Sequence, residues 1–363
     1  MGQQVEVDED RALMLEAIAA AATVRSQTSP NPWVGCVIVP AGDEPAAIGV
    51  TQPPGGQHAE AMALELAGPS AAGAVVYVTL EPCSHHGRTP PCADALIAAG
   101  VRRVVVGLVD PDPHVAGAGI DRLRAAGVEV TVGVAGDEVA EQLAPYLKHR
   151  TTGRPWVVLK LAATLDGRTA APDGTSQWIT GPLARADAHR LRAESDALLV
   201  GAGTVRADDP ALTVRDADGR DPLRVVLGTV PEGARVLPAI ELGGDLGEVL
   251  DELGSRGVIQ LLVEGGATVA HEFHQSGLVD RYVLYLAPVL FGGDDGRPLF
   301  AGAGAATIDD VWRGRILSVQ QLGPDLRIDL AATAAPRPPD TSTVREPAAG
   351  AATPAHAVTG VPA

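Results

Sequence analysis

Short apolar runs and helical segments take turns along the first 150 residues. Four apolar runs have the length and composition of buried strands: 34–39, 74–80, 104–109 and 128–134. Segments with apolar residues on one helical face separate or flank them: 8–26, 58–66, 92–99, 119–126 and 138–148. Strands that alternate with helices predict a mostly parallel sheet covered by helices.

A second alternation begins after Gly153-Arg154-Pro155, which has the composition of a boundary. Its predicted strands are 156–162, 197–200, 223–227, 258–263 and 281–286, and its predicted helices are 182–193, 246–256 and 268–276. The fold class is therefore α/β, with one domain over 1–150 and another over 155–331. From 332 to 363 the chain is rich in Ala, Pro, Thr and Gly, which predicts a disordered tail because little apolar surface is available for burial.

Composition narrows the class of protein. The 363 residues fit two or three domains, and aromatic residues are only 3% of them, so aliphatic side chains must fill the cores. A formal charge of −17 repels nucleic acid and anionic lipid, although a few arginines could still hold a small anion. Three cysteines do not make a disulfide framework. Neither a membrane span nor a signal peptide is recognisable, so we expect a cytoplasmic protein without membrane or nucleic-acid partners.

The strongest chemical pattern is His58-Ala59-Glu60 followed by Glu81-Pro82-Cys83 and, after eight residues, Cys92. Imidazole and thiolate hold zinc well, and a catalytic zinc site keeps its fourth position open for water. The metal lowers the pKa of that water to about 7, and a free carboxylate can move its protons. We therefore predict His58, Cys83 and Cys92 as zinc ligands and Glu60 as the catalytic acid–base. Cys36 lies inside an apolar run and is predicted to be a core residue.

Each piece of this pattern is weak alone, since a lone His-x-Glu also begins ordinary surface helices.

In the second half, the run 201–206 follows a strand but lacks the third glycine of a dinucleotide fingerprint, because Arg206 stands there. The run 263–268 is a better candidate: a strand, a glycine pair and a helix whose first N–H groups could meet a phosphate. The alternative interpretation of this glycine pair is an ordinary turn that binds no phosphate.

The segment 82–92, preceded by Pro30-Asn31-Pro32-x-Val34-Gly35, resembles the bifunctional riboflavin-biosynthesis deaminase–reductase family. Nucleoside and RNA-editing deaminases separate the two cysteines by two residues, whereas eight separate them here. The resemblance covers about 10–331 and implies a cytidine-deaminase-like three-layer α/β/α domain. It also implies one Zn²⁺ per chain, an Asn31 contact with the pyrimidine, and contacts of His85 and Arg88 with the ribose phosphate. Relatives often have another histidine where this chain has Thr51.

The segments 160–168, 176–180 and 208–213 resemble the reductase half of the same family, whose α/β fold is similar to dihydrofolate reductase and which uses NADPH. The resemblance implies these NADPH contacts: Ala162, Trp178, Thr204, Asp208 and Gly266. It implies these substrate contacts: Ser176, Arg192, Leu212, Arg215 and Glu264. Lys160 and Asp208 are the candidates for assisting proton movement during reduction.

The implied function is zinc-dependent deamination of 2,5-diamino-6-ribosylamino-4(3H)-pyrimidinone 5′-phosphate. NADPH-dependent reduction of the ribosyl group of 5-amino-6-(5-phosphoribosylamino)uracil to ribityl follows. The expected partner is this small phosphorylated pyrimidine, and a homo-oligomer is possible. One alternative is a nucleic-acid or nucleoside deaminase, which the cysteine spacing, the charge and the second domain disfavour. The other is a non-catalytic zinc and nucleotide-binding protein, in which Glu60 or His85 would have to be a fourth ligand.

Overall fold

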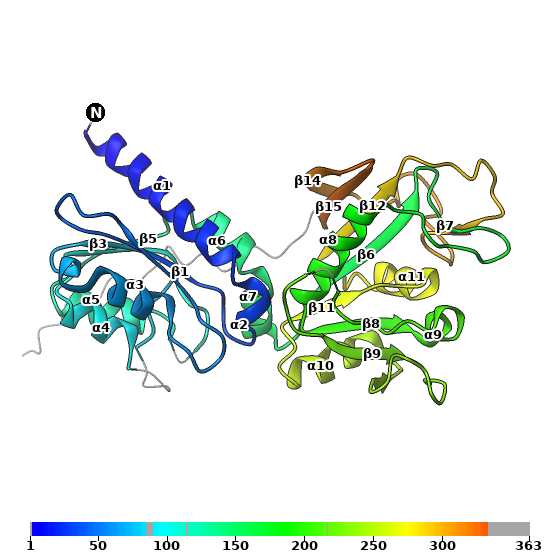
Figure 1. Cartoon of the computed structure of the whole chain (residues 1–363), viewed down its shortest axis with the longest axis horizontal. Coiled ribbons are helices and arrows are strands. Elements are labelled where there is room, and N and C mark those ends of the chain that lie inside the picture. Colours follow the sequence, from blue (N-terminus) through cyan, green and yellow to red (C-terminus); the bar gives the residue numbers. More distant parts are fainter. Residues whose placement is uncertain (1, 85–89, 114, 216, 333–363) are drawn as a thin grey trace, which may run out of the picture.

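The computed structural model describes residues 2–84, 90–113, 115–215 and 217–332, and it consists of two α/β units that lie side by side (Figure 1). The first unit runs from the N-terminus to helix α7 (Ala144–Thr152), and the second begins at strand β6 (Trp156–Thr164). The predicted tail, 332–363, lies outside the described residues except for Ala332. Among the described helices, none is both long enough and apolar enough to span a bilayer.

The first unit contains a five-stranded sheet in the order β2-β1-β3-β4-β5. Its strands are β1 (Gly35–Val39), β2 (Ala47–Val50), β3 (Val75–Leu80), β4 (Arg103–Leu108) and β5 (Glu129–Val132). Strand β1 is antiparallel to β2 and to β3, whereas β3, β4 and β5 are mutually parallel. The sheet is therefore mixed, which differs from the mostly parallel arrangement that the alternation predicted for this unit.

Helices cover both faces of this sheet and give the predicted three layers (Figure 1). Helices α3 (Ala59–Ala67), α4 (Cys92–Ala98) and α5 (Ala118–Ala125) lie on one face, and α1 (Gly2–Ala22) and α6 (Gly136–Gln142) lie on the other. Two glycines let helices approach closely: a Cβ on Gly35 would lie 2.0 Å from the Ala17 carbonyl oxygen of α1, and one on Gly49 would lie 2.1 Å from the Ala59 oxygen of α3.

Strand directions bring four loops to one end of this sheet. Because β1 runs antiparallel to its neighbours, its first residue, Gly35, lies opposite the last residue of β2, Val50. The Gly35 N–H also donates to the Thr79 hydroxyl near the end of β3, at 3.2 Å. The loops before β1, after β2, after β3 and after β4 therefore meet at the same edge, where ligands bind in open α/β sheets.

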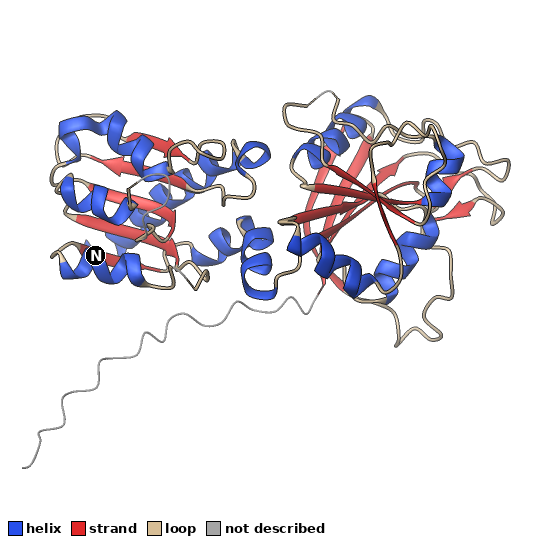
Figure 2. Cartoon of the chain, turned by 90° about the horizontal axis from the view of Figure 1, so that it is seen from below, coloured by secondary structure: helices blue, strands red, loops and turns tan. Residues whose placement is uncertain are grey.

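The second unit contains an eight-stranded sheet in the order β10-β9-β8-β11-β6-β12-β15-β14, which twists strongly in Figure 2. The strands after β6 are β8 (Ala197–Gly201), β9 (Leu223–Leu227), β10 (Ile240–Leu242), β11 (Gln260–Val263), β12 (Arg281–Ala287), β14 (Gly314–Leu322) and β15 (Asp325–Ala332). The helices are α8 (Pro182–Ala193), α9 (Ala202–Asp208), α10 (Leu246–Ser255) and α11 (Ala267–Gln275). The pairs are parallel from β10 to β12, and only the last two strands pair antiparallel. Two short strands, β7 (Arg168–Ala170) and β13 (Arg297–Pro298), form a separate ribbon.

The two units touch through polar side chains. Arg25, in the short helix α2 (Arg25–Thr28), donates to the Gln260 side-chain oxygen at 2.6 Å, and the Ser29 hydroxyl donates to Asp196. The Lys148 ammonium donates to Asp280 at 2.5 Å. The first core also includes a residue of the second unit, Ile259. The boundary near residue 153 is therefore bridged by direct contacts.

A buried ion pair holds α1 against the sheet. The Arg103 guanidinium on β4 donates to both carboxylate oxygens of Asp10 at 3.0 and 2.7 Å, and the Tyr77 hydroxyl donates to the same carboxylate at 2.9 Å. Asp10 is 5% exposed and Arg103 is 8% exposed. Removing one partner of such a pair deprives the other buried charge of its main counter-charge.

Asp10→Asn should lower the free energy of unfolding of the first unit by about 3 kcal/mol or more, because Arg103 loses its buried counter-charge. The matched control is Glu138→Gln, which removes an exposed ion pair with the neighbouring Arg11 and should cost less than about 1 kcal/mol. Urea unfolding of both variants provides the comparison. Equal losses would contradict the role given to the buried pair.

Candidate active sites

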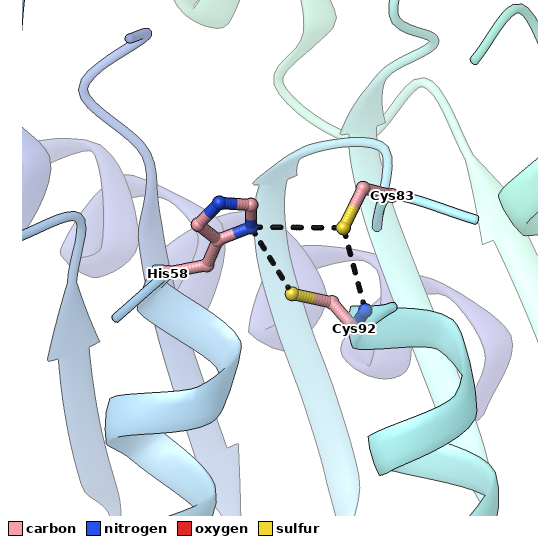
Figure 3. A group of neighbouring side chains, drawn as sticks. All are labelled: His58, Cys83 and Cys92. Carbon is pink, nitrogen blue, oxygen red and sulfur yellow. Dashed lines mark hydrogen bonds between the residues drawn. The ribbon is translucent and has the colours of Figure 1, made fainter. Parts of the chain in front are cut away.

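Three elements bring His58, Cys83 and Cys92 together (Figure 3). His58 immediately precedes α3, Cys83 lies in the loop after β3, and Cys92 is the first residue of α4. The His58 Nδ1 atom lies 3.6 Å from the Cys83 sulfur and 3.3 Å from the Cys92 sulfur. The ligand atoms of the three residues all lie within 4.8 Å of one another.

These separations fit one zinc ion. Zinc binds nitrogen at about 2.0 Å and sulfur at about 2.3 Å, so tetrahedral angles place two such ligand atoms about 3.6 Å apart. The observed Nδ1–sulfur distances of 3.3 and 3.6 Å agree with that value. Hydrogen bonds from Cys92 and His58 lower the pKa of the Cys83 thiol to about 4, so a thiolate, the form that binds metal, is already favoured.

Glu60 lies in the first turn of α3, two residues from His58, and is 3% exposed. Burial raises the pKa of its carboxyl group to about 7, with the neighbouring Cys83 charge acting in the same direction. A carboxyl group with a pKa near neutrality can both accept and return a proton. The structure therefore places a suitable acid–base beside the three metal-binding side chains.

The remaining deaminase candidates lie around the same sheet edge or outside the described residues. Asn31 is half-buried in the loop before β1, and its backbone N–H donates to the Thr28 oxygen at 2.9 Å. Thr51 is buried after β2, and its hydroxyl accepts the Val34 N–H at 3.0 Å, so this side chain braces the Asn31 loop. His85 and Arg88 fall in the segment 85–89, which is not among the described residues. Cys36 is fully buried in the core, as predicted.

One residue of the first site was missed by sequence reasoning, although it belongs to the quoted motif. Glu81 is 4% exposed, and its carboxylate accepts backbone N–H groups of the segment after β4. The available signal was an acidic residue placed directly after a mostly apolar strand and directly before Pro82-Cys83. A carboxylate at such a position needs buried partners.

In the second unit, Arg192 and Glu264 form a bidentate ion pair. The Arg192 Nε and Nη2 atoms donate to the two Glu264 oxygens at 2.7 and 2.8 Å, while Nη1 donates to the Thr213 carbonyl at 3.0 Å. Burial alone would raise the pKa of Glu264, but the charges of Arg192 and Lys160 lower it to about 2. Lys160, on β6, also lies over the Tyr285 ring, with its nitrogen 5.9 Å from the centroid.

Two of the predicted cofactor residues touch each other. The Gly266 N–H donates to the Thr204 hydroxyl at 3.2 Å, which joins α9 to the first turn of α11. The run 263–268 is the predicted strand, glycine pair and helix start, and no described side chain caps α11. Its first N–H groups are therefore available to an anion. Asp208 is exposed at the end of α9, and Ala162 lies on β6.

Ser176 and Trp178 line an open pocket of about 250 Å³, together with Thr164 and the loop 289–291. Trp178 is 67% exposed, and the Arg185 guanidinium lies 4.5 Å from its ring centre. Leu212, unlike Ser176 and Trp178, does not line this pocket. It is 3% exposed and packs in the core under α8. Arg215 has an exposed side chain, and its backbone N–H donates to His189 at 3.1 Å.

The first site has the residues and the geometry of a zinc-dependent deaminase, and a second α/β domain is joined to it in the same chain. Two family models match it, the "Cytidine and deoxycytidylate deaminase zinc-binding region" over residues 7–108 and the "RibD C-terminal domain" over residues 155–328. The Mycobacterium tuberculosis "Riboflavin biosynthesis protein RibD" is 46% identical over 330 residues, covering 87% of this chain and 95% of that protein. The chain belongs to the RibD family.

Solved structures agree with this assignment over both units. RibD of Acinetobacter baumannii is 40% identical and superposes with a TM-score of 0.84, covering 90% of this chain and 100% of that one. A Thermotoga maritima protein, named as a diaminohydroxyphosphoribosylaminopyrimidine deaminase/5-amino-6-(5-phosphoribosylamino)uracil reductase, is 34% identical with a TM-score of 0.81, covering 90% and 99%. The predicted fold class and family are confirmed.

The Glu264 ion pair gives a pH-dependent prediction. Because the pKa of Glu264 in the folded chain is lowered to about 2, its stabilising effect is present above the unfolded value near 4.5 and disappears as pH falls towards 2. Glu264→Gln should therefore be less stable than the natural chain at pH 7 by roughly 3 kcal/mol, and this gap should narrow below pH 4.5. Denaturant unfolding at several pH values measures it.

The exposed Glu232 of the same unit supplies the control, because Glu232→Gln should leave stability unchanged across the whole range. A gap for Glu264→Gln that stayed constant from pH 7 down to pH 3 would contradict the ion-pair explanation.

Proposed function

We propose that this chain catalyses two consecutive reactions of riboflavin biosynthesis. It is a hydrolase that deaminates 2,5-diamino-6-ribosylamino-4(3H)-pyrimidinone 5′-phosphate. It is also an oxidoreductase that uses NADPH to reduce the ribosyl group of 5-amino-6-(5-phosphoribosylamino)uracil to ribityl. The observation that carries the first activity is the cluster of His58, Cys83 and Cys92 with the buried acid Glu60 beside it. Family membership over both halves supports the second.

The deaminase domain is assigned to residues 1–150 and the reductase domain to 155–331. The helix α7 ends at Thr152, two residues beyond the assigned end of the deaminase domain, and β6 begins at Trp156, one residue after the assigned start of the reductase domain. The family models that match residues 7–108 and 155–328 support this division.

In the deaminase site, His58, Cys83 and Cys92 would hold the zinc ion. When bound, zinc lowers the pKa of water and so supplies the nucleophile at neutral pH. Glu60 would accept one proton from that water and pass it to the ring nitrogen, and it would then take the second proton from the resulting hydroxyl group and deliver it to the amino group that departs as ammonia. Its pKa near 7 suits both transfers. The water-poor setting of Glu60, which is 3% exposed, keeps its proton from exchanging freely with solvent.

Substrate contacts in this site are assigned from the resemblance of the sequence motifs to the RibD family. Asn31 would contact the pyrimidine from the loop before β1, which Thr51 braces through Val34. His85 and Arg88 would meet the phosphate from the loop between the two cysteines, and an arginine suits a phosphate because its planar fork donates two hydrogen bonds. The substrate class is a small phosphorylated pyrimidine.

In the reductase site, NADPH supplies the hydride chemistry, and the protein supplies position and charge. The cofactor contacts would be Ala162, Trp178, Thr204, Asp208 and Gly266. A hydrogen bond joins two of these residues, Thr204 and Gly266. The substrate contacts would be Ser176, Arg192, Leu212, Arg215 and Glu264. Leu212 would contribute its backbone, since its side chain is buried. Lys160 and Asp208 would assist proton movement.

We further infer that the chain works in the cytoplasm on small molecules, without a nucleic-acid or membrane partner. The formal charge of −17 supports this because such a field repels polyanions. A homo-oligomer is compatible with both activities, and light scattering on the purified chain measures its size. The whole proposal is tested by incubating the chain with the diaminopyrimidine phosphate, with and without NADPH, while ammonia and NADPH absorbance are followed.

Glu60→Gln should reduce ammonia release by about 10²–10⁴-fold, because the amide cannot accept a proton. Zinc content should stay at the natural level, since Glu60 is not among the three clustered ligands. NADPH oxidation with the already deaminated substrate should be unchanged. Loss of zinc from this variant would instead favour a structural metal site with Glu60 as a fourth ligand.

Lys160→Met should slow NADPH oxidation by at least about 10²-fold at saturating NADPH, because the cation beside Glu264 is lost while the side-chain length is kept. Ammonia release by the same preparation serves as the internal control and should not change. An unaltered reduction rate would remove Lys160 from the proposed mechanism.

A further inference from the structure

The Glu81 carboxylate is buried between two parts of the deaminase domain and is saturated by backbone donors. Its Oε2 atom accepts the N–H groups of Asp110 at 3.2 Å and Gly117 at 2.9 Å, and its Oε1 atom accepts those of Gly119 at 2.9 Å and Ile120 at 3.3 Å. Because it accepts hydrogen bonds from four backbone N–H groups, this carboxylate holds the backbone at these four positions in place. The three clustered metal-binding side chains do not include it.

Two of these donors belong to the first turn of α5, whose N–H groups have no partner within the helix. The residue before the helix, Gly117, has no side chain that could cap them. Glu81 therefore caps α5 from the end of β3, and its negative charge is favoured at that helix terminus. In this way α5 is fixed to the strand that leads directly into Cys83.

Helix α5 also touches the Cys83 loop itself. A Cβ on Gly119 would lie 1.9 Å from the Pro82 carbonyl oxygen, so only glycine allows the helix to approach this closely. The Arg122 side chain donates to the Ser84 carbonyl, one residue beyond Cys83, at 3.4 Å. The helix therefore contacts the loop on both sides of the first sulfur ligand.

The same arginine reaches the element that carries the second sulfur. Arg122 pairs with Asp94 in the first turn of α4, which begins at Cys92. The Cys83 loop meets α4 directly as well, because the Cys92 N–H donates to the Cys83 sulfur at 3.4 Å and the Ala93 N–H donates to the Cys83 oxygen at 3.2 Å. The elements that carry Cys83 and Cys92 therefore both contact the same helix, α5.

From these contacts we propose that Glu81 is a positioning residue of the deaminase, which sets the separation of the Cys83 and Cys92 sulfurs through α5. Zinc needs its ligands at nearly fixed distances, and the contacts of α5 with Ser84 and Asp94 hold the two elements that carry the sulfurs. Residues behind metal ligands typically change metal affinity by about 10–100-fold when replaced. This inference rests on the zinc site proposed above.

Glu81→Gln in the full chain tests the proposal, because the amide keeps the size but turns donors towards backbone N–H groups. We expect the variant to bind zinc about 10–100-fold more weakly than the natural chain. A competing chelator should therefore remove its zinc at a correspondingly lower concentration. The visible spectrum of the Co²⁺-substituted variant should also change. Excess zinc should restore part of the deaminase rate, because Glu60 is intact, and NADPH oxidation should be unaffected throughout.

The matched control is Glu65→Gln, which changes an exposed acid of the same domain that accepts a surface hydrogen bond from Gln57. It should retain natural zinc affinity. Arg122→Gln keeps the proposal testable if Glu81→Gln does not fold, and it should weaken zinc binding in the same direction by removing the Ser84 and Asp94 contacts.

Natural zinc affinity in the folded Glu81 variant, or in the Arg122 variant if Glu81→Gln does not fold, would overturn the positioning role and leave the proposed function intact. A natural chain that takes up no zinc would instead refute the proposed function itself. The two failures are therefore distinguishable in one titration.

Discussion

The deaminase half depends on one constraint: an imidazole and two sulfurs, contributed by separate elements, must come within reach of a single ion. The mixed sheet meets this constraint because antiparallel β1 and β2 place the loops before β1 and after β2 beside the loop after β3. Helices α3 and α4 then begin at that edge, and each begins at or directly after a ligand, His58 and Cys92. Ligand separations of 3.3 and 3.6 Å are the outcome.

Three buried glutamates show how surroundings determine what a carboxylate can do. For Glu60 burial is the largest influence, and in the metal-free site it raises the pKa to about 7, so that the carboxyl group can carry a proton. Glu264 is slightly more exposed and faces Arg192 and Lys160, so its pKa falls to about 2 and it stays an anion. Glu81 is surrounded by backbone N–H groups and fixes a helix. The sequence alone shows three identical residue types.

Much of the fold and of the first site could be predicted from the sequence, for identifiable reasons. The apolar runs at 34–39 and 74–80 are long and continuous, and they became β1 and β3. The metal ligands carry rare residue types in a rare spacing. Strand β2 was missed because it is short and half-exposed, and the β14–β15 hairpin was missed because many of its side chains face solvent. The helix predicted over 138–148 divides at Leu143, before Pro145. The partners of Glu81 and the pairing of Arg192 with Glu264 depend on tertiary contacts, which no local pattern encodes.

The most direct test of this account is a crystal structure of the purified chain with anomalous diffraction measured at the zinc absorption edge. The account predicts one zinc ion whose only protein ligands are the His58 Nδ1 atom and the Cys83 and Cys92 sulfurs, with Glu60 beside it and unbound. A fourth protein ligand on the ion, or a zinc ion bound elsewhere in the chain with this cluster empty, would contradict it.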